Sequence, residues 1–305
     1  MTVPASRLDP AAVRRALDDA GLRARHSLSQ NFLVDLEVLE AILAEADPRP
    51  GRGVLEIGPG LGVLTGGLLD AGAAVTAVEL DDGLTARLRD RFAPALEIGA
   101  ADPLAAGGLL LINGDALDQD LVGLRPPPYD VVANLPYHIT SPILHRLLGA
   151  PPRPERLVLM VQREVAERIA AAPGKMSYLS VFVQYHAAAR IALRVPRTAF
   201  EPAPEVESAV IVLTPYPADD RLDPAAEDEL WRLVQAGFRE RRKMLHNVLA
   251  RQLPLTPAQV TIALETAGIA PDRRPQTLAV GEWIRLLEVV GPLGPDQRGR
   301  RSGDR

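Results

Sequence analysis

A glycine-rich turn, residues 58–62 (Gly-Pro-Gly-Leu-Gly), directly follows a short apolar run and precedes a helix-like segment. Glycine lets the backbone approach a ligand closely, and open α/β sheets bind nucleotides at turns that follow the carboxyl ends of their strands. Glu79 follows Gly58 by 21 residues and ends the next apolar run. A carboxylate there can accept hydrogen bonds from both hydroxyls of a ribose. The turn and the acid together predict a pocket for an adenosine-type ligand.

Two more polar positions follow apolar runs farther along the chain. Asp115 comes after the third run, where its carboxylate could accept from an adenine amino group. The fourth run ends in Asn134-Leu135-Pro136-Tyr137, which offers an amide oxygen and a backbone carbonyl stiffened by proline beside an aromatic ring. Such a site can hold an exocyclic amine and stack the attached ring. An ordinary proline turn that ends a strand fits this position equally well.

These residues need strands that end at one edge of a common sheet. Apolar runs alternate with helical patterns between Asp35 and Gln162, which is typical of βαβ units and a mostly parallel α/β sheet. Helices are expected at Asp9–Ala20 and Asp35–Ala46, and two further strands at Ser180–His186 and Val206–Pro215. The segment Pro94–Gly108 is longer than such a connection needs, and we expect an exposed, loose insertion.

The pattern becomes helical from about Ala218 onward. We therefore expect an α/β domain over residues 1–216, whose first 25 residues (1–25) are an N-terminal extension. A small all-helical domain follows over residues 217–292. The tail, residues 293–305, has four arginines and almost no apolar residues, and a disordered basic segment is expected there.

Composition excludes several classes of protein. The 305 residues contain no cysteine, which excludes disulfides, thiolate metal sites and cysteine nucleophiles. The five histidines lack metal-binding spacing, so no metal is expected. The chain has no apolar run long enough to cross a membrane and no apolar stretch at its start that resembles a secretory signal. A cytoplasmic protein that does not bind membranes is the expectation, and nothing in the sequence suggests more than a monomer.

The formal net charge of −5 conceals a basic segment. Residues 232–251 contain six basic residues and one acidic residue, a local charge of +5. The basic side chains cluster at Arg239, Arg241, Arg242 and Lys243. Such a cluster is a candidate phosphate-binding surface, although a solvated helix face would give the same pattern.

Taken in order, the motifs resemble the ribosomal RNA adenine dimethyltransferases, and more narrowly the group that acts on 16S rRNA. The matching segments are Gln30–Leu33, Glu56–Thr65, Val78–Asp81, Asn113–Leu117, Asn134–Pro142, Gln162–Ile169, Phe200–Val210 and Arg241–Leu249. Each segment alone would be a weak signal, but together they are specific and span most of the chain. One departure is His138, where asparagine is frequent in the family.

The resemblance implies a Rossmann-like sheet that binds S-adenosylmethionine, with the helical domain contacting RNA. The residues implied to contact the methyl donor are Asn31, Leu33, Gly58, Glu79, Asp115 and Asn134. Tyr137 and Phe200 would stack on the target adenine, and Arg239, Arg241, Arg242 and Lys243 would contact RNA. The implied partner is 16S rRNA within the small ribosomal subunit, and the implied reaction is dimethylation of two adjacent adenines in its 3′-terminal hairpin, late in subunit assembly.

The residues also suggest how transfer would proceed. The adenine 6-amino lone pair is delocalised into the ring. If Asn134 Oδ1 and the Leu135 carbonyl accept its two hydrogens, the nitrogen can pyramidalise toward the methyl group, and no general base is needed before transfer. Pro136 would keep the two acceptors rigid.

Three alternatives compete with this interpretation. A 23S rRNA adenine methylase would share the Asn134–Tyr137 motif, although the match at residues 241–249 favours the small-subunit group. A catalytically silent assembly or nucleic-acid-binding factor could keep the fold, but the intact motif and acids argue against lost chemistry. An NAD-dependent dehydrogenase would require glycine at position 63, which is Val63.

Overall fold

A computed structural model of the chain describes residues 31–217 and 221–293. The expected helix Asp9–Ala20, the extension of residues 1–25 and nearly all of the tail lie outside the described residues. The chain divides into two compact units. The first comprises the described residues up to Glu167 together with His186–Pro215, and the second comprises Arg168–Tyr185 together with the described residues from Tyr216 onward.

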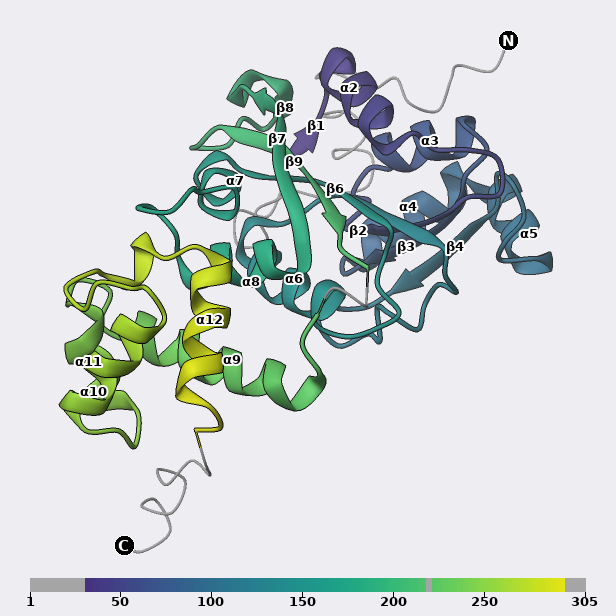
Figure 1. Ribbon diagram of the computed structural model, residues 1–305. Helices are drawn as coiled ribbons and strands as arrows, with labels where there is room; N and C mark the ends of the chain where they lie inside the picture. Colours follow the sequence, from purple (N-terminus) through teal and green to yellow (C-terminus); the bar gives the residue numbers. More distant parts are fainter. Residues whose placement is uncertain (1–30, 218–220, 294–305) are drawn as a thin grey trace, which may run out of the picture. The chain divides into compact units, whose positions relative to one another are not determined.

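A seven-stranded sheet organises the described part of the first unit, in the order β4-β3-β2-β5-β6-β9-β7 (Figure 1). Neighbours from β4 to β6 are parallel, whereas β9 is antiparallel to both β6 and β7. The bounds are β2 (Gly53–Ile57), β3 (Ala74–Glu79), β4 (Leu109–Asn113), β5 (Tyr129–Asn134), β6 (Arg156–Gln162), β7 (Ala187–Val195) and β9 (Ser208–Pro215). A separate pair joins β1 (Phe32–Leu33) to β8 (Phe200–Glu201).

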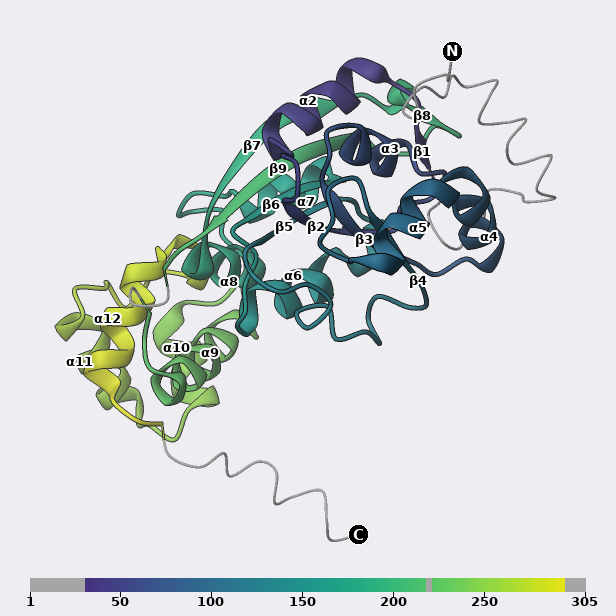
Figure 2. The same cartoon turned by 90° about the vertical axis from the view of Figure 1, so that its right-hand side faces the viewer.

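Helices cover both faces of this sheet. Those of the first unit are α2 (Leu36–Ala46), α3 (Val63–Asp70), α4 (Asp82–Arg91), α5 (Ala93–Ala101) and α6 (Thr140–Gly149), with the 3-10 turns η2 (Tyr137–Ile139) and η3 (Arg197–Ala199). In both Figure 1 and Figure 2, α2 and α3 lie on one side of the strands and α6 lies on the other. This two-sided cover explains why the central strands β2, β3 and β5 are almost continuously buried.

Local sequence explains where these elements begin. Asp35 caps α2 by accepting hydrogen bonds from the backbone of Glu37 and Val38, at 3.0 and 3.2 Å. The apolar side of α2 then supplies Leu39 and Ile42 to a core cluster that also contains Val54 and Val132 of the sheet. The expected helix over residues 35–46 is therefore confirmed, and Val206–Pro215 is confirmed as a strand apart from its first two residues.

The expected strand at Ser180–His186 is wrong, because Tyr178–His186 forms helix α8. Nearly every side chain in this segment is buried, so its apolar run carries no helical period, and its valines and aromatics favour a strand by composition. A reciprocal cap starts the helix: Ser177 accepts from Ser180 N–H at 3.2 Å, and Ser180 accepts from Ser177 N–H at 2.8 Å. The strand comes next, as β7, whose alanines are poor strand formers.

The segment Pro94–Gly108 is more ordered than expected. It is mostly exposed, but its first part forms α5, which packs closely against β4. A Cβ atom at Gly99 would lie 2.2 Å from the backbone oxygen of Leu109. The glycine is what allows this close approach between helix and strand.

The second unit is helical among its described residues. Its helices after α8 are α9 (Pro224–Phe238), α10 (Leu245–Gln252), α11 (Pro257–Thr266) and α12 (Val280–Val290), with the 3-10 turn η5 (Pro275–Thr277); α7 (Arg163–Ile169) spans the division between the units. Its core gathers around Trp283, which is fully buried with Leu230, Leu264 and Leu286.

Candidate active site

A cavity of about 340 Å³ lies at the carboxyl ends of the parallel strands β2 to β5. This volume is within the range typical of small-molecule sites. Six residues that sequence analysis assigned to the methyl donor line it together, namely Asn31, Leu33, Gly58, Glu79, Asp115 and Asn134. Leu135, Pro136 and Tyr137 line it as well. Residues up to 108 positions apart in the chain therefore share one cavity, because parallel strands end at the same edge of the sheet.

The glycine turn forms one wall because its backbone adopts a conformation that other residues rarely take. Gly58 and Gly62 have φ values of 70° and 75°. The Gly58 N–H donates to the Val78 carbonyl at 2.9 Å, which ties the end of β2 to the end of β3. A Cβ atom on Gly62 would lie 2.5 Å from a ring carbon of Phe92, so close helix packing also requires glycine there.

Glu79 ends β3 with its carboxylate fixed in place. One oxygen accepts from Gly60 N–H at 3.0 Å and the other from Asp81 N–H at 2.9 Å. The side chain is 5% exposed, and burial raises the pKa of its carboxyl above the ordinary value. Each oxygen keeps a further lone pair for a ligand hydroxyl. Asp115 is half-buried, and its Oδ1 accepts from Leu117 N–H at 2.7 Å.

Asn134 and Leu135 end β5 in defined orientations. The Asn134 amide nitrogen donates a long hydrogen bond of 3.4 Å to the Asn31 carbonyl. With its nitrogen used in this way, the amide presents Oδ1 as an acceptor on its other side. Leu135 is buried, and its N–H donates to the Met160 carbonyl at 3.1 Å, which fixes the peptide group next to Pro136.

Tyr137 and Phe200, the two aromatic residues assigned to base stacking, lie in different environments. Tyr137 lines the cavity and is half-buried. Phe200 is 3% exposed and belongs to the core cluster, where β8 pairs it with Leu33. The structure therefore does not bring Phe200 to the cavity wall with Tyr137. Its stacking role stays a prediction and would require the ring to leave this packing.

Glu56 also lines the cavity, although no role was predicted for it from the sequence. The residue is 1% exposed, and burial raises the pKa of its carboxyl to about 8, so it is mostly neutral at pH 7. Thr65 donates to it at 2.7 Å. The missed signal was an acid inside an otherwise apolar strand, Gly53–Ile57. His138 also lines the cavity mouth and is exposed.

The four predicted RNA-contacting residues lie in the second unit, on the turn between α9 and α10. Arg239, Arg241, Arg242 and Lys243 are all exposed, and none of them forms an ion pair among the described residues. The acid between them, Glu240, is bound by Arg251 at 2.9 Å instead. The cluster therefore keeps its positive charge in the structure.

Two further findings concern metals and membranes in the described part of the chain. No group of three or more histidine, aspartate and glutamate side chains there lies close enough together to hold a metal ion. None of the helices found in residues 31–217 and 221–293 is long and apolar enough to cross a membrane.

Comparison with known proteins decides the family. The model of the ribosomal RNA adenine dimethylase family matches residues 21–291. The chain belongs to this family. Membership confirms the predicted enzyme class, an S-adenosylmethionine-dependent rRNA adenine dimethyltransferase, and with it the family resemblance drawn from the motifs.

Individual relatives of this dimethylase extend the match. A protein of Dehalococcoides mccartyi (strain ATCC BAA-2100 / JCM 16839 / KCTC 5957 / BAV1) called ribosomal RNA small subunit methyltransferase A is 38% identical over 92% of this chain and 94% of its own length. A protein of the same name from Synechococcus sp. (strain RCC307) is 42% identical over 90% and 98%.

Solved structures confirm the predicted fold class. The crystal structure of a dimethyladenosine transferase from Plasmodium falciparum has a TM-score of 0.69 with 26% identity, and the match covers 84% of this chain and 96% of that one. The crystal structure of the 23S rRNA methyltransferase ErmE has a TM-score of 0.65 with 30% identity, over 85% and 99%.

Proposed function

We propose that this dimethylase transfers methyl groups from S-adenosylmethionine to the 6-amino groups of two adjacent adenines in the 3′-terminal hairpin of 16S rRNA, late in small-subunit assembly. The observation that carries the proposal is the shared cavity of Glu79, Asp115 and Asn134–Tyr137. The predicted pocket for the methyl donor and the motif that would hold the acceptor amine thus lie together at the carboxyl ends of the parallel strands. The enzyme would act in the cytoplasm as a monomer, where it meets the assembling subunit.

The residues at the strand ends fit the methyl donor. Glu79 offers fixed carboxylate oxygens for ribose hydroxyls, and Asp115 offers an acceptor for the adenine amino group. The glycine turn between β2 and α3 lets backbone atoms approach the ligand. Leu33, in β1, and Asn31, the residue before β1, would complete this wall. The bound donor supplies an activated methyl group on a sulfonium, so the protein has mainly to position the acceptor.

The acceptor amine would be held by Asn134 and Leu135. Asn134 Oδ1 and the Leu135 carbonyl accept the two amino hydrogens, and this removes nitrogen lone-pair density from the ring. The lone pair would then point at the methyl group, and the N–CH3 bond would form as the S–CH3 bond breaks, leaving S-adenosylhomocysteine. The positive charge that develops on nitrogen would meet these fixed dipoles and the Tyr137 face until the amine loses a proton to water. The hydrogen bond from Asn134 to the Asn31 carbonyl supports this because it fixes which side of the amide accepts.

The target base must leave its stack to enter the cavity, which costs least in a loop or an unpaired hairpin. The exposed basic turn of Arg239, Arg241, Arg242 and Lys243 would hold the RNA backbone. Replacing both Arg241 and Arg242 by alanine should weaken binding to all RNA sequences and lower the salt slope of the binding constant by about 1 for each phosphate that is no longer bound. The paired variant Arg274→Ala and Arg285→Ala, elsewhere in the second unit, is the control. Equal salt slopes for both variants would contradict this role.

Two competing functions are less well supported. A 23S rRNA substrate is less well supported because the two relatives described above, which are 38% and 42% identical over 90% or more of this chain, are both named for the small subunit. The cavity argues against a silent assembly factor, because every residue of the Asn134–Tyr137 motif lines it together with the residues predicted to bind the methyl donor.

The test is methyl transfer from labelled S-adenosylmethionine to small subunits that lack dimethyladenosine, with the product mapped by RNA mass spectrometry. Dimethylation of two adjacent adenines near the 3′ end would support the proposal. Tight binding without transfer would favour the assembly factor, and labelling of large-subunit RNA alone would favour the 23S enzyme.

A further inference from the structure

Ser208 opens strand β9 and is completely buried. Its backbone lies between two neighbouring strands, opposite Gln162 of β6 and Val195 of β7. A residue held between two strands has little freedom to move. Ser208 does not line the cavity, so it has no predicted contact with either substrate.

The hydroxyl of Ser208 lies 3.0 Å from the hydroxyl of Tyr137, a hydrogen-bonding distance at which either group can donate. Burial raises the pKa of Tyr137 above its ordinary value, so the phenol keeps its proton at neutral pH. The two residues are 71 positions apart in the chain. The bond therefore joins the motif that ends β5 to the first residue of β9.

The backbone of Tyr137 is fixed independently of this bond. Its carbonyl accepts from the Thr140 hydroxyl at 3.3 Å, and the preceding carbonyl, of Pro136, accepts from Ile139 N–H at 3.2 Å. A tyrosine side chain has two main torsions, so a fixed backbone together with a fixed hydroxyl determines where the ring lies. The ring borders the cavity between these two anchors.

We propose that Ser208 is a positioning residue that sets the plane of the Tyr137 ring for stacking on the target adenine. The inference rests on the proposed function, because it assumes that Tyr137 stacks on this base. The alternative is that the bond only satisfies a buried serine, in which case its loss would change stability and leave methyl transfer unaffected.

The second methyl transfer should depend on this bond more than the first. Adenine presents two hydrogens to Asn134 and Leu135, whereas the monomethylated amine presents only one. Because only one of the two acceptors can then hold the amine, the base relies more on stacking for its orientation. A loosened Tyr137 ring should therefore slow the second transfer more than the first, and monomethyladenine should accumulate.

The test is a double-mutant cycle of Ser208→Ala and Tyr137→Phe, with both transfers followed in single-turnover reactions on small subunits. Each single variant should slow the first transfer by about 5- to 10-fold, the effect of one hydrogen bond. The double variant should be no slower than the slower single variant, because both changes remove the same bond. The ratio of monomethyl to dimethyl product should rise in all three, while binding of S-adenosylhomocysteine stays at the wild-type value.

Thr76→Val is the matched control, because it removes a buried hydroxyl of the same sheet that has no hydrogen-bond partner among the described residues. It should leave both transfer rates and the product ratio unchanged. Wild-type rates in Ser208→Ala, or effects that multiply in the double variant, would overturn the proposal.

A readout without transfer separates this inference from the proposed function. An RNA hairpin with 2-aminopurine at the target position should lose fluorescence when Tyr137 stacks on it, and Ser208→Ala should recover fluorescence at unchanged RNA affinity. If the wild-type chain transferred no methyl group, the proposed function would fail, but this recovery would still support the positioning role. Equal fluorescence in wild type and Ser208→Ala would overturn it.

Discussion

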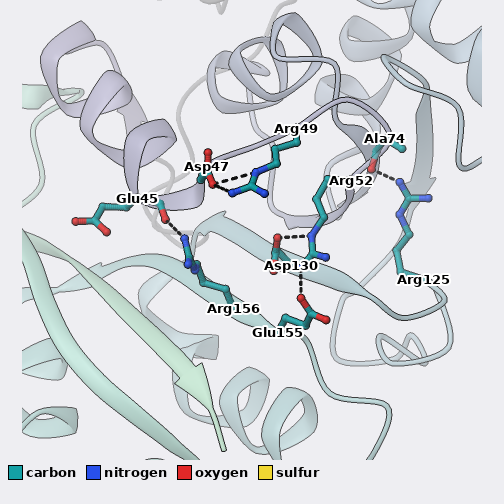
Figure 3. Close-up of polar contacts among 9 residues, drawn as sticks. All are labelled: Glu45, Asp47, Arg49, Arg52, Ala74, Arg125, Asp130, Glu155 and Arg156. Atoms are coloured by element: carbon teal, nitrogen blue, oxygen red, sulfur yellow. Dashed lines mark hydrogen bonds and ion pairs between the residues drawn. The ribbon is translucent and has the colours of Figure 1, made fainter.

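Asp130 and Asn134 lie on the same strand, β5, near its amino and carboxyl ends. At the amino end, Asp130 accepts two hydrogen bonds of 2.7 Å from Arg52, which also donates to Glu155 at 2.8 Å (Figure 3). These contacts raise the pKa of the Arg52 guanidinium further above its ordinary value, so the group stays charged. The arginine thus connects the starts of β2, β5 and β6.

The same end of the sheet contains a second arginine, which is buried. Arg125 is 2% exposed, and its guanidinium donates to the backbone carbonyl of Ala74, where β3 starts (Figure 3). It also donates to the backbone carbonyl of Pro103. Charges at this end therefore meet acids or carbonyls on neighbouring segments. They serve to hold strands and connections together.

At the carboxyl end of the sheet, the buried acids have different partners. Glu56 and Glu79 are buried beside the cavity, and neither forms an ion pair among the described residues. Burial raises the pKa of both carboxyls, and only Thr65 and backbone N–H groups bind them. A desolvated acid without a cationic partner costs folding free energy, a cost typical of functional sites.

Structural and functional polar residues of this sheet differ in their partners. A buried charge with a matched partner acts on stability, whereas buried polar groups that converge on a cavity without such partners act on a ligand. Substitutions at the two ends should therefore change different quantities.

Among Tyr137→Ala, Arg52→Ala and Glu56→Gln, the largest effect is expected for Tyr137→Ala at the carboxyl end. Loss of a base stack worth about 1–3 kcal/mol should slow methyl transfer by the folded protein by about 10- to 100-fold. Thermal stability should fall as well, because the buried Ser208 hydroxyl loses its partner. Single-turnover transfer and thermal unfolding measure the two quantities. Tyr216→Ala, at a tyrosine outside the cavity lining, is the control and should transfer at the wild-type rate. An unchanged rate in Tyr137→Ala would remove Tyr137 from the mechanism.

An effect of similar size, on stability instead of rate, is expected for Arg52→Ala at the amino end. Asp130 would lose its partner while 10% exposed, and the free energy of unfolding should fall by about 2–3 kcal/mol. Transfer by the folded fraction should be unchanged. Arg49→Ala is the control, because the side chain of Arg49 is 72% exposed and its bond to Asp47 should add nothing measurable. A changed transfer rate in Arg52→Ala at low temperature would show that the amino end of the sheet also affects catalysis.

The effect that is smallest for a change of one pH unit is the pH dependence contributed by Glu56. Its carboxyl has a pKa of about 8 when folded and an ordinary, lower pKa when unfolded, so the folded state binds more protons between these values. The contribution of Glu56 to the free energy of unfolding is fully present below the pKa of the unfolded state and is lost as the pH rises toward 8. Relative to Glu56→Gln, the wild-type free energy of unfolding should fall by about 1 kcal/mol per pH unit between pH 5 and 8. Urea unfolding of both proteins at each pH checks this, and parallel profiles would refute it.

Much of the parallel sheet and its cavity could be predicted from the sequence, because polar motifs follow the apolar runs and mark the carboxyl ends of the strands. Gly58, Glu79, Asp115 and Asn134 are predicted to lie together for this reason, and the structure groups them. The helix Tyr178–His186 does not follow, because burial on all sides removes the period that identifies a helix.

Contacts between distant segments could not be predicted either. The bond of Tyr137 to Ser208 depends on β9 inserting between β6 and β7, and the burial of Phe200 depends on the β1–β8 pair. Neither pairing leaves a local sequence signal. The elevated pKa of Glu56 likewise depends on helices that cover both faces of the sheet.

The most direct test compares Asn134→Ala with Asp130→Ala, since the two positions share a strand and differ in the edge that they face. Methyl transfer to small subunits, RNA binding and thermal unfolding would be measured for both variants. We predict that Asn134→Ala loses about 100-fold or more of its transfer rate while keeping RNA binding and stability. Asp130→Ala should lose stability and keep the rate of its folded fraction. A fully active Asn134→Ala would contradict the account.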